Sequence, residues 1–474
     1  MTALAEKSSV AYISINRIIV AFFVIWTLAL IILTAFYQDS SPFFILMFAL
    51  IIGIPPTITF VDDKEQNLLV FLKIFATLLV IATVVQVYMH FIFDVPIQVV
   101  SDMNKFYHAA LGDFGQFTLG VRQTMDSPYP VIVWQYVYNL ATYLGVPRTP
   151  ILGIILNSLI MSWSGVITWR LGKLFLDVKT CNILVWLFAL SGFTWLFGVT
   201  FLRDCYALFL NVLFIYYSLI FIDSNPTKAM RIAALFGMAI TFYLSLYTRA
   251  ESILFLLMWG GLLTFFKGFN NLRFFVLVIA GTIIGGVLFM TVFNGMIYIL
   301  YFATSIITRQ EYVNAANDAQ GLGTTLILSQ PIPIRVTLGT ILLHANPIPL
   351  WSGFDVSFGV YKWLKSFGGI YLALLVPSLL VGFVTSFRTD VADTQAKRNI
   401  IKANAIFCII VAVVIAMTSM EQRHYAVYLP QLILLALIPN YKSKALLKTY
   451  SIVFSFWMLA LFGVHTFWAY LKFL

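Results

Sequence analysis

The chain has 474 residues, of which 61% are hydrophobic and 10% are charged, and its formal net charge is +10. Soluble domains carry about 25% charged residues, so this composition excludes a soluble protein and indicates an integral membrane protein. The three cysteines, Cys181, Cys205 and Cys408, form no CxxC pair. They therefore indicate neither a disulfide framework nor a zinc site.

Apolar stretches long enough to cross a bilayer core of roughly 30 Å recur along the whole chain. We predict thirteen transmembrane helices, at about residues 17–37, 43–61, 68–92, 150–169, 180–202, 205–222, 231–248, 252–266, 274–297, 367–387, 400–419, 424–439 and 450–470. The expected fold class is all-α, with residues 1–474 forming a single polytopic transmembrane domain.

The charge distribution orients these helices. With the N-terminus in the cytoplasm, the whole excess of +10 falls on the cytoplasmic side, as the positive-inside rule requires. The basic balance is therefore a topology signal, and we expect no nucleic-acid partner. The expected location is the bacterial inner membrane, with the functional face outside the cytoplasm.

The segment VIVWQYVYNLATYLGV, at 131–146, is apolar but short and rich in aromatic residues. If it crossed the membrane, every later loop would change sides and the basic loops would lie outside. We therefore predict an interfacial or re-entrant helix here. Two large extracytoplasmic loops result, at 93–149 and 298–366, and we expect both to carry interfacial helices.

Unusual polar residues gather on the predicted extracytoplasmic side. Three tight hairpins between consecutive helices carry charge: Arg203–Asp204, Arg249–Glu251 and Glu421–Arg423. For one hairpin alone, a capped turn with an arginine that reaches the lipid head groups is a sufficient explanation. Because charges at such depth face protein or water, the whole set predicts a shared site. Its other members are Asp102, His108, Arg122, Glu311, Arg335, His344 and His424.

The five histidines show no metal-ligand spacing such as HxxxH or HExxH. We therefore predict no catalytic metal built on histidine, and no cofactor. No nucleotide-binding fingerprint is present either, which favours a lipid-linked sugar donor over a sugar nucleotide.

Arginines and carboxylates that face outward from a membrane body suit a lipid substrate that carries phosphate. A guanidinium group can form two parallel hydrogen bonds with phosphate oxygens. A carboxylate can deprotonate an acceptor hydroxyl. The set therefore predicts glycosyl transfer from a polyprenyl phosphate or diphosphate, with the arginines stabilising the leaving phosphate.

Two stretches resemble the GT-C superfamily of membrane glycosyltransferases. VVSDMNKFYHAALG followed by YPVIVWQYVYNLATYLGVP is similar to the first large outer loop of that family, where an acidic residue precedes a Y-x-x-A element and a proline-led interfacial helix. RHYAVYLPQLILL is similar to its R-Y-x-x-P-x-x-P-type span, with His424 in place of the tyrosine and only Pro430 retained. In the family the acidic loop follows the first span, whereas here it follows the third.

The elements LRDCYALFL and PIPIR…NPIPLW look more like proteins of polysaccharide gene clusters, including O-antigen polymerases. The resemblance implies an enzyme that uses an undecaprenyl-linked saccharide, and we favour a repeat-unit polymerase over a single-sugar transferase. The implied partners are this donor, membrane lipid, a saccharide acceptor and other polysaccharide-assembly proteins.

The candidate residues divide into three roles. We expect Asp102 to be the general base, with Glu311 as the second candidate. The expected phosphate ligands are Arg203, Arg249, Arg335 and Arg423. The expected supporting residues are Asp204, Glu251, His108, Arg122, His344 and His424.

A flippase or transporter of lipid-linked oligosaccharide is the main alternative. It would need polar residues near the bilayer midplane, broken helices and an alternating-access route. The first nine predicted spans carry few charges away from their ends, which argues against it. A structural membrane subunit fits poorly with so many arginines on one face.

Overall fold

The fold is taken from a computed structural model that describes residues 2–38, 41–59, 63–93, 102–112, 128–223, 227–249, 251–268, 327, 330–348, 354, 359–439 and 443–473. The regular structure in these residues is all helical, which confirms the all-α prediction. Nine of the described helices are long and apolar enough to cross a membrane, or ten if one bent pair is a further span. The protein is therefore a multi-pass membrane protein. The chain forms two compact units, residues 1–213 with 354–368 and residues 214–353 with 369–474.

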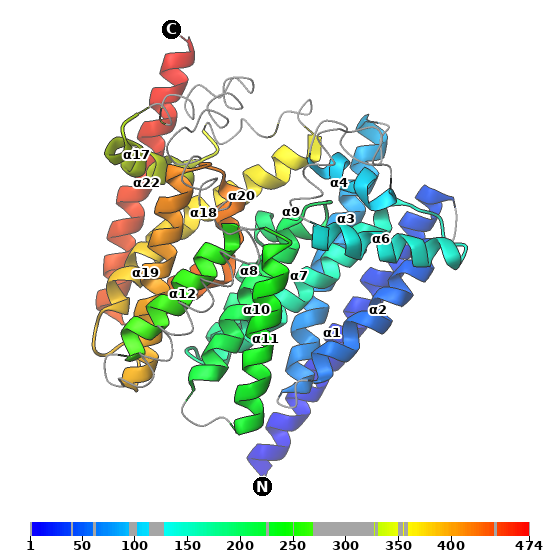
Figure 1. Cartoon of the computed structure of the whole chain (residues 1–474), viewed down its shortest axis with the longest axis horizontal. Coiled ribbons are helices and arrows are strands. Elements are labelled where there is room, and N and C mark those ends of the chain that lie inside the picture. The colour runs from blue at the N-terminus through cyan, green and yellow to red at the C-terminus, as the bar shows by residue number, and fades with distance from the viewer. Residues whose placement is uncertain are drawn as a thin grey trace, which may run out of the picture. The chain divides into compact units, whose positions relative to one another are not determined.

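The first unit is built around a central helix, α7. Its helices are α1 (Thr2–Tyr37), α2 (Ser41–Thr59), α3 (Lys64–Phe93), α4 (Asp102–Leu111), α6 (Pro128–Tyr143), α7 (Pro150–Lys173), α8 (Val178–Ala189), α9 (Gly192–Gly198) and the first half of α10 (Asp204–Ile222). Helix α7 packs against α2, α3, α8 and α9 (Figure 1). The hydroxyls of Ser162, Ser164 and Thr168 donate to carbonyls four residues earlier in α7. The helix can therefore be buried without leaving these hydroxyls unpaired.

Helices α8 and α9 form a bent pair, where one straight span was predicted at 180–202. Their axes meet at 60° across a break of two residues. At the break, Ser191 caps α9 by accepting a hydrogen bond from the N–H of Phe193 (3.3 Å). Trp195 Nε1 donates to the carbonyl of Ala189 (2.8 Å). These two bonds satisfy backbone groups that the bend releases, which is the condition for a break at membrane depth.

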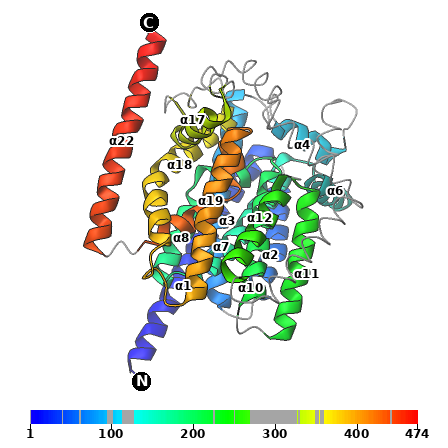
Figure 2. The ribbon, with the colours of Figure 1, turned by 60° about the vertical axis from the view of Figure 1, so that its left-hand side comes forward.

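The second unit holds α11 (Lys228–Leu246), α12 (Glu251–Gly268), α17 (Ile332–Ala345), most of α18 (Gly359–Ser386), α19 (Gln395–Met417), α20 (Gln422–Ala426), α21 (Leu429–Leu437) and α22 (Lys444–Phe473). Helix α19 packs against α12, α17 and α21. Tyr428 lies between α12 and α19, with its ring 5.2 Å from that of Phe255 and 5.4 Å from that of Phe407. In Figure 2, α22 stands apart from the other helices of this unit. Two of its contacts with the unit are Trp457 Nε1, which donates to the carbonyl of Ala373 (2.7 Å), and His465 Nε2, which lies 3.3 Å from the carbonyl of Pro347.

Several predicted spans are shorter or broken in the structure. The segment predicted at 424–439 forms the short helices α20 and α21, and the one at 252–266 lies within α12. The span predicted at 274–297 and most of the loop at 298–366 lie outside the described residues. The predicted interfacial helix at 131–146 is α6, which has 16 residues and is not among the candidate spans of the described part of the chain.

Gly192 allows the first turn of α9 to approach the start of α18 within the first unit. A Cβ atom at Gly192 would lie 2.6 Å from the carbonyl carbon of Phe367 and would also collide with the backbone of Gly368. Relieving this collision requires a shift of the α18 backbone, so we expect Gly192→Ala to destabilise the protein by about 1–3 kcal/mol. The thermal unfolding midpoint in detergent measures this.

A matched glycine provides the control for Gly192→Ala. Gly261 lies inside α12, and none of the described residues lies within 4 Å of a Cβ atom built on it. Alanine is the better helix former, so Gly261→Ala is expected to stabilise by about 0.5–1 kcal/mol. Equal midpoints for the two variants would contradict the close approach at Gly192.

Candidate functional site

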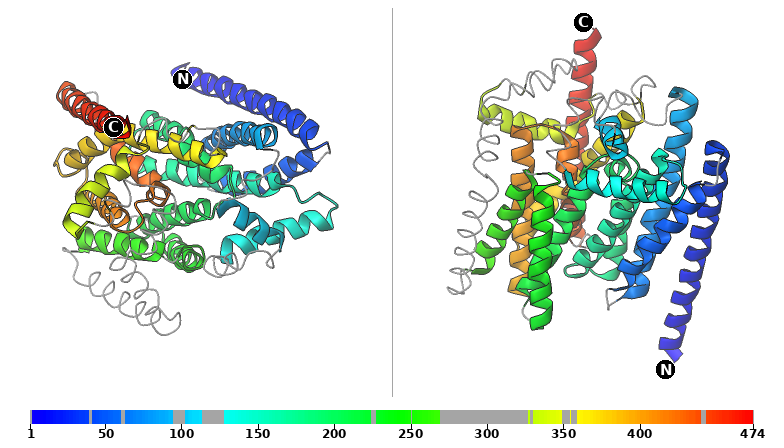
Figure 3. Two further views of the ribbon diagram at one scale, coloured as in Figure 1. Left: turned by 90° about the horizontal axis from the view of Figure 1, so that it is seen from above. Right: turned by 45° about the vertical axis from the view of Figure 1, so that its right-hand side comes forward.

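An aromatic cluster fastens α4 and α6 to the turn that precedes α10. Trp134 of α6 is completely buried. The centroid of its ring lies 5.8 Å from that of Phe106 of α4, 5.5 Å from that of Phe201 and 5.4 Å from that of Tyr206. Figures 1 and 3 show α4 and α6 next to one another, with α6 running crosswise to α3 and α7. We call α4 and α6 together the platform.

Hydrogen bonds between buried groups complete this attachment. Trp134 Nε1 donates to Asn157 Oδ1 of α7 (3.0 Å), and Asn157 Nδ2 donates to the carbonyl of Thr200 (2.6 Å). The hydroxyl of Tyr138 donates to the carbonyl of Thr149 (2.9 Å). Leaving a buried polar group unpaired costs about 1–3 kcal/mol. The amide of Asn157 therefore ties α6 and the turn at Thr200 to α7 in one register.

The C-terminal end of α4 is held by side chains that bind its last carbonyl groups. Gln135 Nε2 donates to the carbonyl of Ala109 (2.8 Å), and Arg148 Nη1 donates to that of Leu111 (3.3 Å). The hydroxyl of Tyr107 donates to the carbonyl of Arg148 (3.1 Å). A cation at this end is also favoured by the helix dipole. Helix α4 is thus fixed at the end opposite to its first residue, Asp102.

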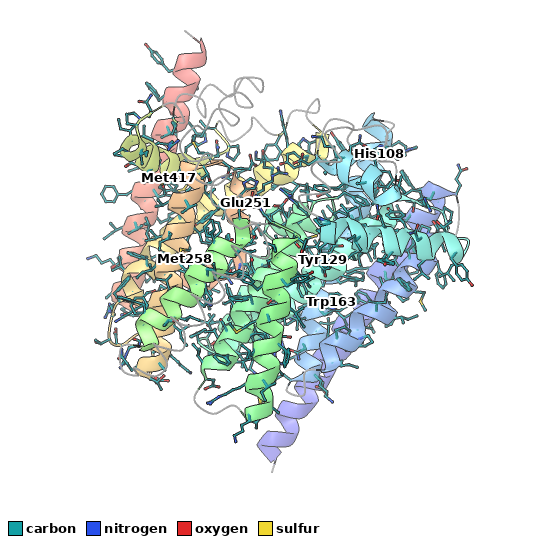
Figure 4. The ribbon with its side chains drawn as sticks, viewed as in Figure 1. His108, Tyr129, Trp163, Glu251, Met258 and Met417 are labelled. Atoms are coloured by element: carbon teal, nitrogen blue, oxygen red, sulfur yellow. The ribbon has the colours of Figure 1, made fainter. Side chains whose placement is uncertain are left out.

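Asp102 and His108 both lie on α4, and both side chains are partly buried. Asp102 is in the first turn, where a carboxylate is stabilised by the helix dipole, and His108 is in the last turn. Their separation of six positions corresponds to about 9 Å along the axis, so they do not form an adjacent pair. Figure 4 shows His108 on α4.

Arg203 and Asp204 stand at the start of α10, after the short turn that follows α9. Asp204 is the first residue of the helix and only 3% exposed. The carbonyl of Arg203 accepts hydrogen bonds from the N–H groups of Tyr206 (3.1 Å) and Ala207 (3.2 Å). A carboxylate in this first turn is favoured by the helix dipole, and Arg203 is partly buried.

Tyr129, at the start of α6, lies against the same turn. Its ring meets that of Tyr206 edge to face, at 5.8 Å between centroids. Burial raises the pKa of the Tyr129 phenol, and the nearby thiol of Cys205 adds to the effect. The phenol is therefore a hydrogen-bond donor, and not an anion, at neutral pH.

In the second unit, Arg249 and Glu251 form an ion pair at the start of α12. Arg249 Nε lies 3.8 Å from Glu251 Oε2, with side-chain exposures of 8% and 43% respectively. The distance is too long for a hydrogen bond. The two exposures show that the guanidinium of Arg249 is the buried member of the pair and that the carboxylate of Glu251 is the exposed one.

Helix α20 is attached to the C-terminal end of α17 by one histidine and one glutamine. His344 Nδ1 lies 2.8 Å from the carbonyl of Thr340, so this nitrogen carries the proton, and Nε2 accepts from the hydroxyl of Tyr425 (3.3 Å). Burial lowers the pKa of His344, which keeps the ring neutral. Gln422 Nε2 donates to the carbonyls of Leu343 (2.8 Å) and Asn346 (3.0 Å). These contacts give His344 a positioning role within the fold.

Two further arginines belong to these elements. Arg335, on α17, is 0% exposed, which is unusual for a residue that remains protonated at all relevant pH values. Arg423, on α20, is partly buried. His424 follows it, and its Nδ1 lies 2.9 Å from Ser419 Oγ. The second unit therefore carries buried or partly buried cations on α17, on α20 and just before α12.

The predicted site residues fall into two groups. Asp102, His108, Arg203 and Asp204 belong to the first unit. Arg249, Glu251, Arg335, His344, Arg423 and His424 belong to the second unit. Glu311 and Arg122 lie outside the described residues. The single site predicted from sequence remains a prediction.

The structure adds residues that the sequence did not single out. Trp134, Asn157, Gln422 and Tyr425 position the candidate residues, although none of them is charged. The signal available in the sequence was the presence of Asn157 inside an apolar span and of Trp134 inside an interfacial segment. An uncharged residue in an apolar segment is most simply interpreted as a packing residue, because its distant hydrogen-bond partner is not visible in the sequence.

No metal site was found in the part of the chain that the structure describes, where no group of three or more His, Cys, Asp or Glu side chains could hold an ion. Comparison with known proteins gave no match: no family model, no curated protein and no solved structure is significantly similar to this chain. The functional argument therefore rests on the residues and their geometry.

Proposed function

We propose that the chain is a membrane glycosyltransferase of the GT-C type. It transfers a saccharide from an undecaprenyl phosphate or diphosphate to an acceptor hydroxyl on the extracytoplasmic face of the bacterial inner membrane. Asp102 accepts the proton of the attacking hydroxyl, and arginines stabilise the phosphate as it leaves. The reaction uses no cofactor.

The observation that carries this proposal is the platform, with Asp102 in the first turn of α4. A short helix with a partly exposed carboxylate in its first turn is anchored, through Trp134, to the end of spanning helices. On the other side of α6, Tyr136 and Tyr143 are 73% and 86% exposed, and exposed tyrosines are typical of the membrane–water interface. This arrangement supports a carboxylate held at the level where a lipid-linked sugar meets water.

The buried cations support a phosphate-bearing substrate. Arg335 and Arg249 are 0% and 7% exposed, and Arg203 and Arg423 are partly buried. Guanidinium groups that are withdrawn from water interact more strongly with phosphate than exposed ones do, because the local dielectric constant is lower. On the sequence pattern, we assign these four residues to the donor phosphate, with Asp204 and Glu251 orienting their arginine neighbours.

Within this class we favour a polymerase of polysaccharide repeat units over a single-sugar transferase, on the resemblance of LRDCYALFL and PIPIR…NPIPLW to proteins of polysaccharide clusters. Such an enzyme would work with other polysaccharide-assembly proteins. Product length separates the two cases, because a polymerase gives a ladder of repeats whereas a transferase adds one unit.

The test is transfer by the purified protein in proteoliposomes that contain a defined undecaprenyl-diphosphate-linked saccharide. We expect saccharide to move to the acceptor, and Arg203→Ala to lower the rate by about 10²–10³-fold through loss of leaving-group stabilisation. Arg388→Ala is the matched control, because Arg388 is exposed and pairs with Asp390 (3.0 Å) in a predicted cytoplasmic loop. Equal rates for both variants would remove Arg203 from the site.

A flippase is the second candidate, and two observations favour it. The α8–α9 pair is bent by 60°. In α21, the buried side-chain amide of Gln431 has no hydrogen-bond partner among the residues that the structure describes. Broken helices and buried polar groups are features of transporters. In the same proteoliposomes, movement of the donor lipid across the membrane without saccharide transfer would establish the flippase and exclude the transferase.

A further inference from the structure

A cavity of about 590 Å³ lies between the first half of α2 and the second half of α6, and the start of α7 also lines it. All of its lining residues except Ser41 are apolar. The volume falls within the roughly 300–1,000 Å³ that is usual for sites that bind small molecules. We call this cavity the α2–α6 groove. An apolar site of this size calls for a hydrocarbon ligand.

The length of the groove matches one leaflet of a bilayer. Its lining on α2 runs from Ser41 to Ile51, which is about 15 Å at 1.5 Å per residue. Half of a bilayer core of roughly 30 Å has the same thickness. One acyl chain fills that distance by definition, because two opposed chains make up the core.

The groove is continuous with the lipid-facing surface of the protein. Met47 and Ile51 on α2 are 37% and 65% exposed, and Leu144 after α6 is 61% exposed. The exposed tyrosines of α6, Tyr136 and Tyr143, indicate that this helix lies at the level of the head groups. The groove therefore opens into the hydrocarbon layer of the leaflet next to α6.

We infer that the α2–α6 groove binds one acyl chain of a glycerophospholipid from this leaflet. The chain lies along α2, and the head group stands at the level of α6. Bound there, the lipid fills the space beneath the platform and supports α6 from the side opposite to α4. A polyprenyl chain is longer than one leaflet and would have to leave the groove. This inference does not depend on the proposed transferase.

Native mass spectrometry of the detergent-purified protein tests the inference, with dioleoyl phosphatidylglycerol and undecaprenyl phosphate as probes. We expect the wild type to retain one phosphatidylglycerol. Met47→Trp places a bulky side chain in the groove and is expected to lower the retained fraction by about tenfold, because apolar binding falls steeply with lost contact area. Ile58→Trp is the matched control, since Ile58 lies on the same helix, is 40% exposed and does not line the groove.

Two outcomes would overturn the inference. One is equal retention of phosphatidylglycerol by the wild type and Met47→Trp. The other is displacement of phosphatidylglycerol by an equal concentration of undecaprenyl phosphate, which would make the groove a polyprenyl site. If Met47→Trp does not fold, Leu144→Gln serves instead, because Leu144 is exposed at the end of the groove and its replacement does not disturb the core. The measurement needs no turnover, so it separates this inference from the proposed function.

Discussion

Asp102→Asn is expected to lower saccharide transfer by about 10²–10⁴-fold, the usual contribution of a general base. The amide has the shape of the carboxylate and can still accept a hydrogen bond at the start of α4, but it cannot take the proton of the acceptor hydroxyl. Because α4 is held at its other end through Ala109 and Leu111, the fold should be retained. The rate of the chemical step should fall while binding of the donor lipid is unchanged.

Asp390→Asn is the control for this experiment. Asp390 is an exposed aspartate that forms an ion pair with Arg388 (3.0 Å), and the predicted topology places it in the cytoplasm. Its replacement should leave transfer unchanged. Full activity of Asp102→Asn would exclude Asp102 as the base and would make Glu311, the second candidate, the residue to replace next.

Trp134→Ala is expected to destabilise the protein by about 3–5 kcal/mol, the range for removal of a fully buried tryptophan. The substitution deletes the ring that joins Phe106, Phe201 and Tyr206. It also leaves Asn157 Oδ1 without its donor. We expect α4 and α6 to become sensitive to protease, and the thermal unfolding midpoint in detergent to fall.

Trp186→Ala is the control, and it tests whether the loss of stability is specific to Trp134 or follows from replacing any tryptophan. Trp186, on α8 of the same unit, is 43% exposed, and Lys73 Nζ lies 5.7 Å from the centroid of its ring. Loss of such a cation–π contact costs about 0.5–1 kcal/mol. A midpoint for Trp134→Ala that is no lower than that for Trp186→Ala would contradict the anchoring of the platform.

The two variants together separate chemistry from positioning. Asp102→Asn should lose transfer with a stable platform, whereas Trp134→Ala should lose stability and transfer together. Trp134→Phe keeps much of the aromatic packing but not the hydrogen bond to Asn157. It is therefore expected to be less destabilised than Trp134→Ala and to retain more transfer.

The helix predicted at 131–146 is an element that residues close together in the sequence predict. The segment 131–146 is too short to span a membrane and rich in aromatic residues, and the basic loops after it would change sides if it spanned. The structure has helix α6 at Pro128–Tyr143. Its end is a glycine turn, with Gly145 at a φ of +73° and the N–H of Val146 bonded to the carbonyl of Ala141 (2.8 Å). The helix itself follows from residues close in sequence, whereas its interfacial position was argued from basic loops far along the chain and stays a prediction.

Other features depend on partners that are distant in sequence. The aromatic cluster joins Phe106, Trp134 and Tyr206, from three separate helices, with Phe201 of the turn before α10. The bend between α8 and α9 has one local signal, Ser191–Gly192, but the collision that requires glycine there involves Phe367 and Gly368. A periodic pattern carries no information about either contact.

The sequence by itself determined that the chain is all-helical and crosses a membrane many times, because hydropathy and helix propensity are sums over neighbouring residues. It also located the charged residues at the ends of spans. Only the tertiary structure decided that α8 and α9 are bent, that α6 is anchored through Trp134 and Asn157, and that the candidate residues group within two compact units. The physical reason is that packing and buried hydrogen bonds join side chains far apart in the chain, and their free energies depend on which surfaces meet.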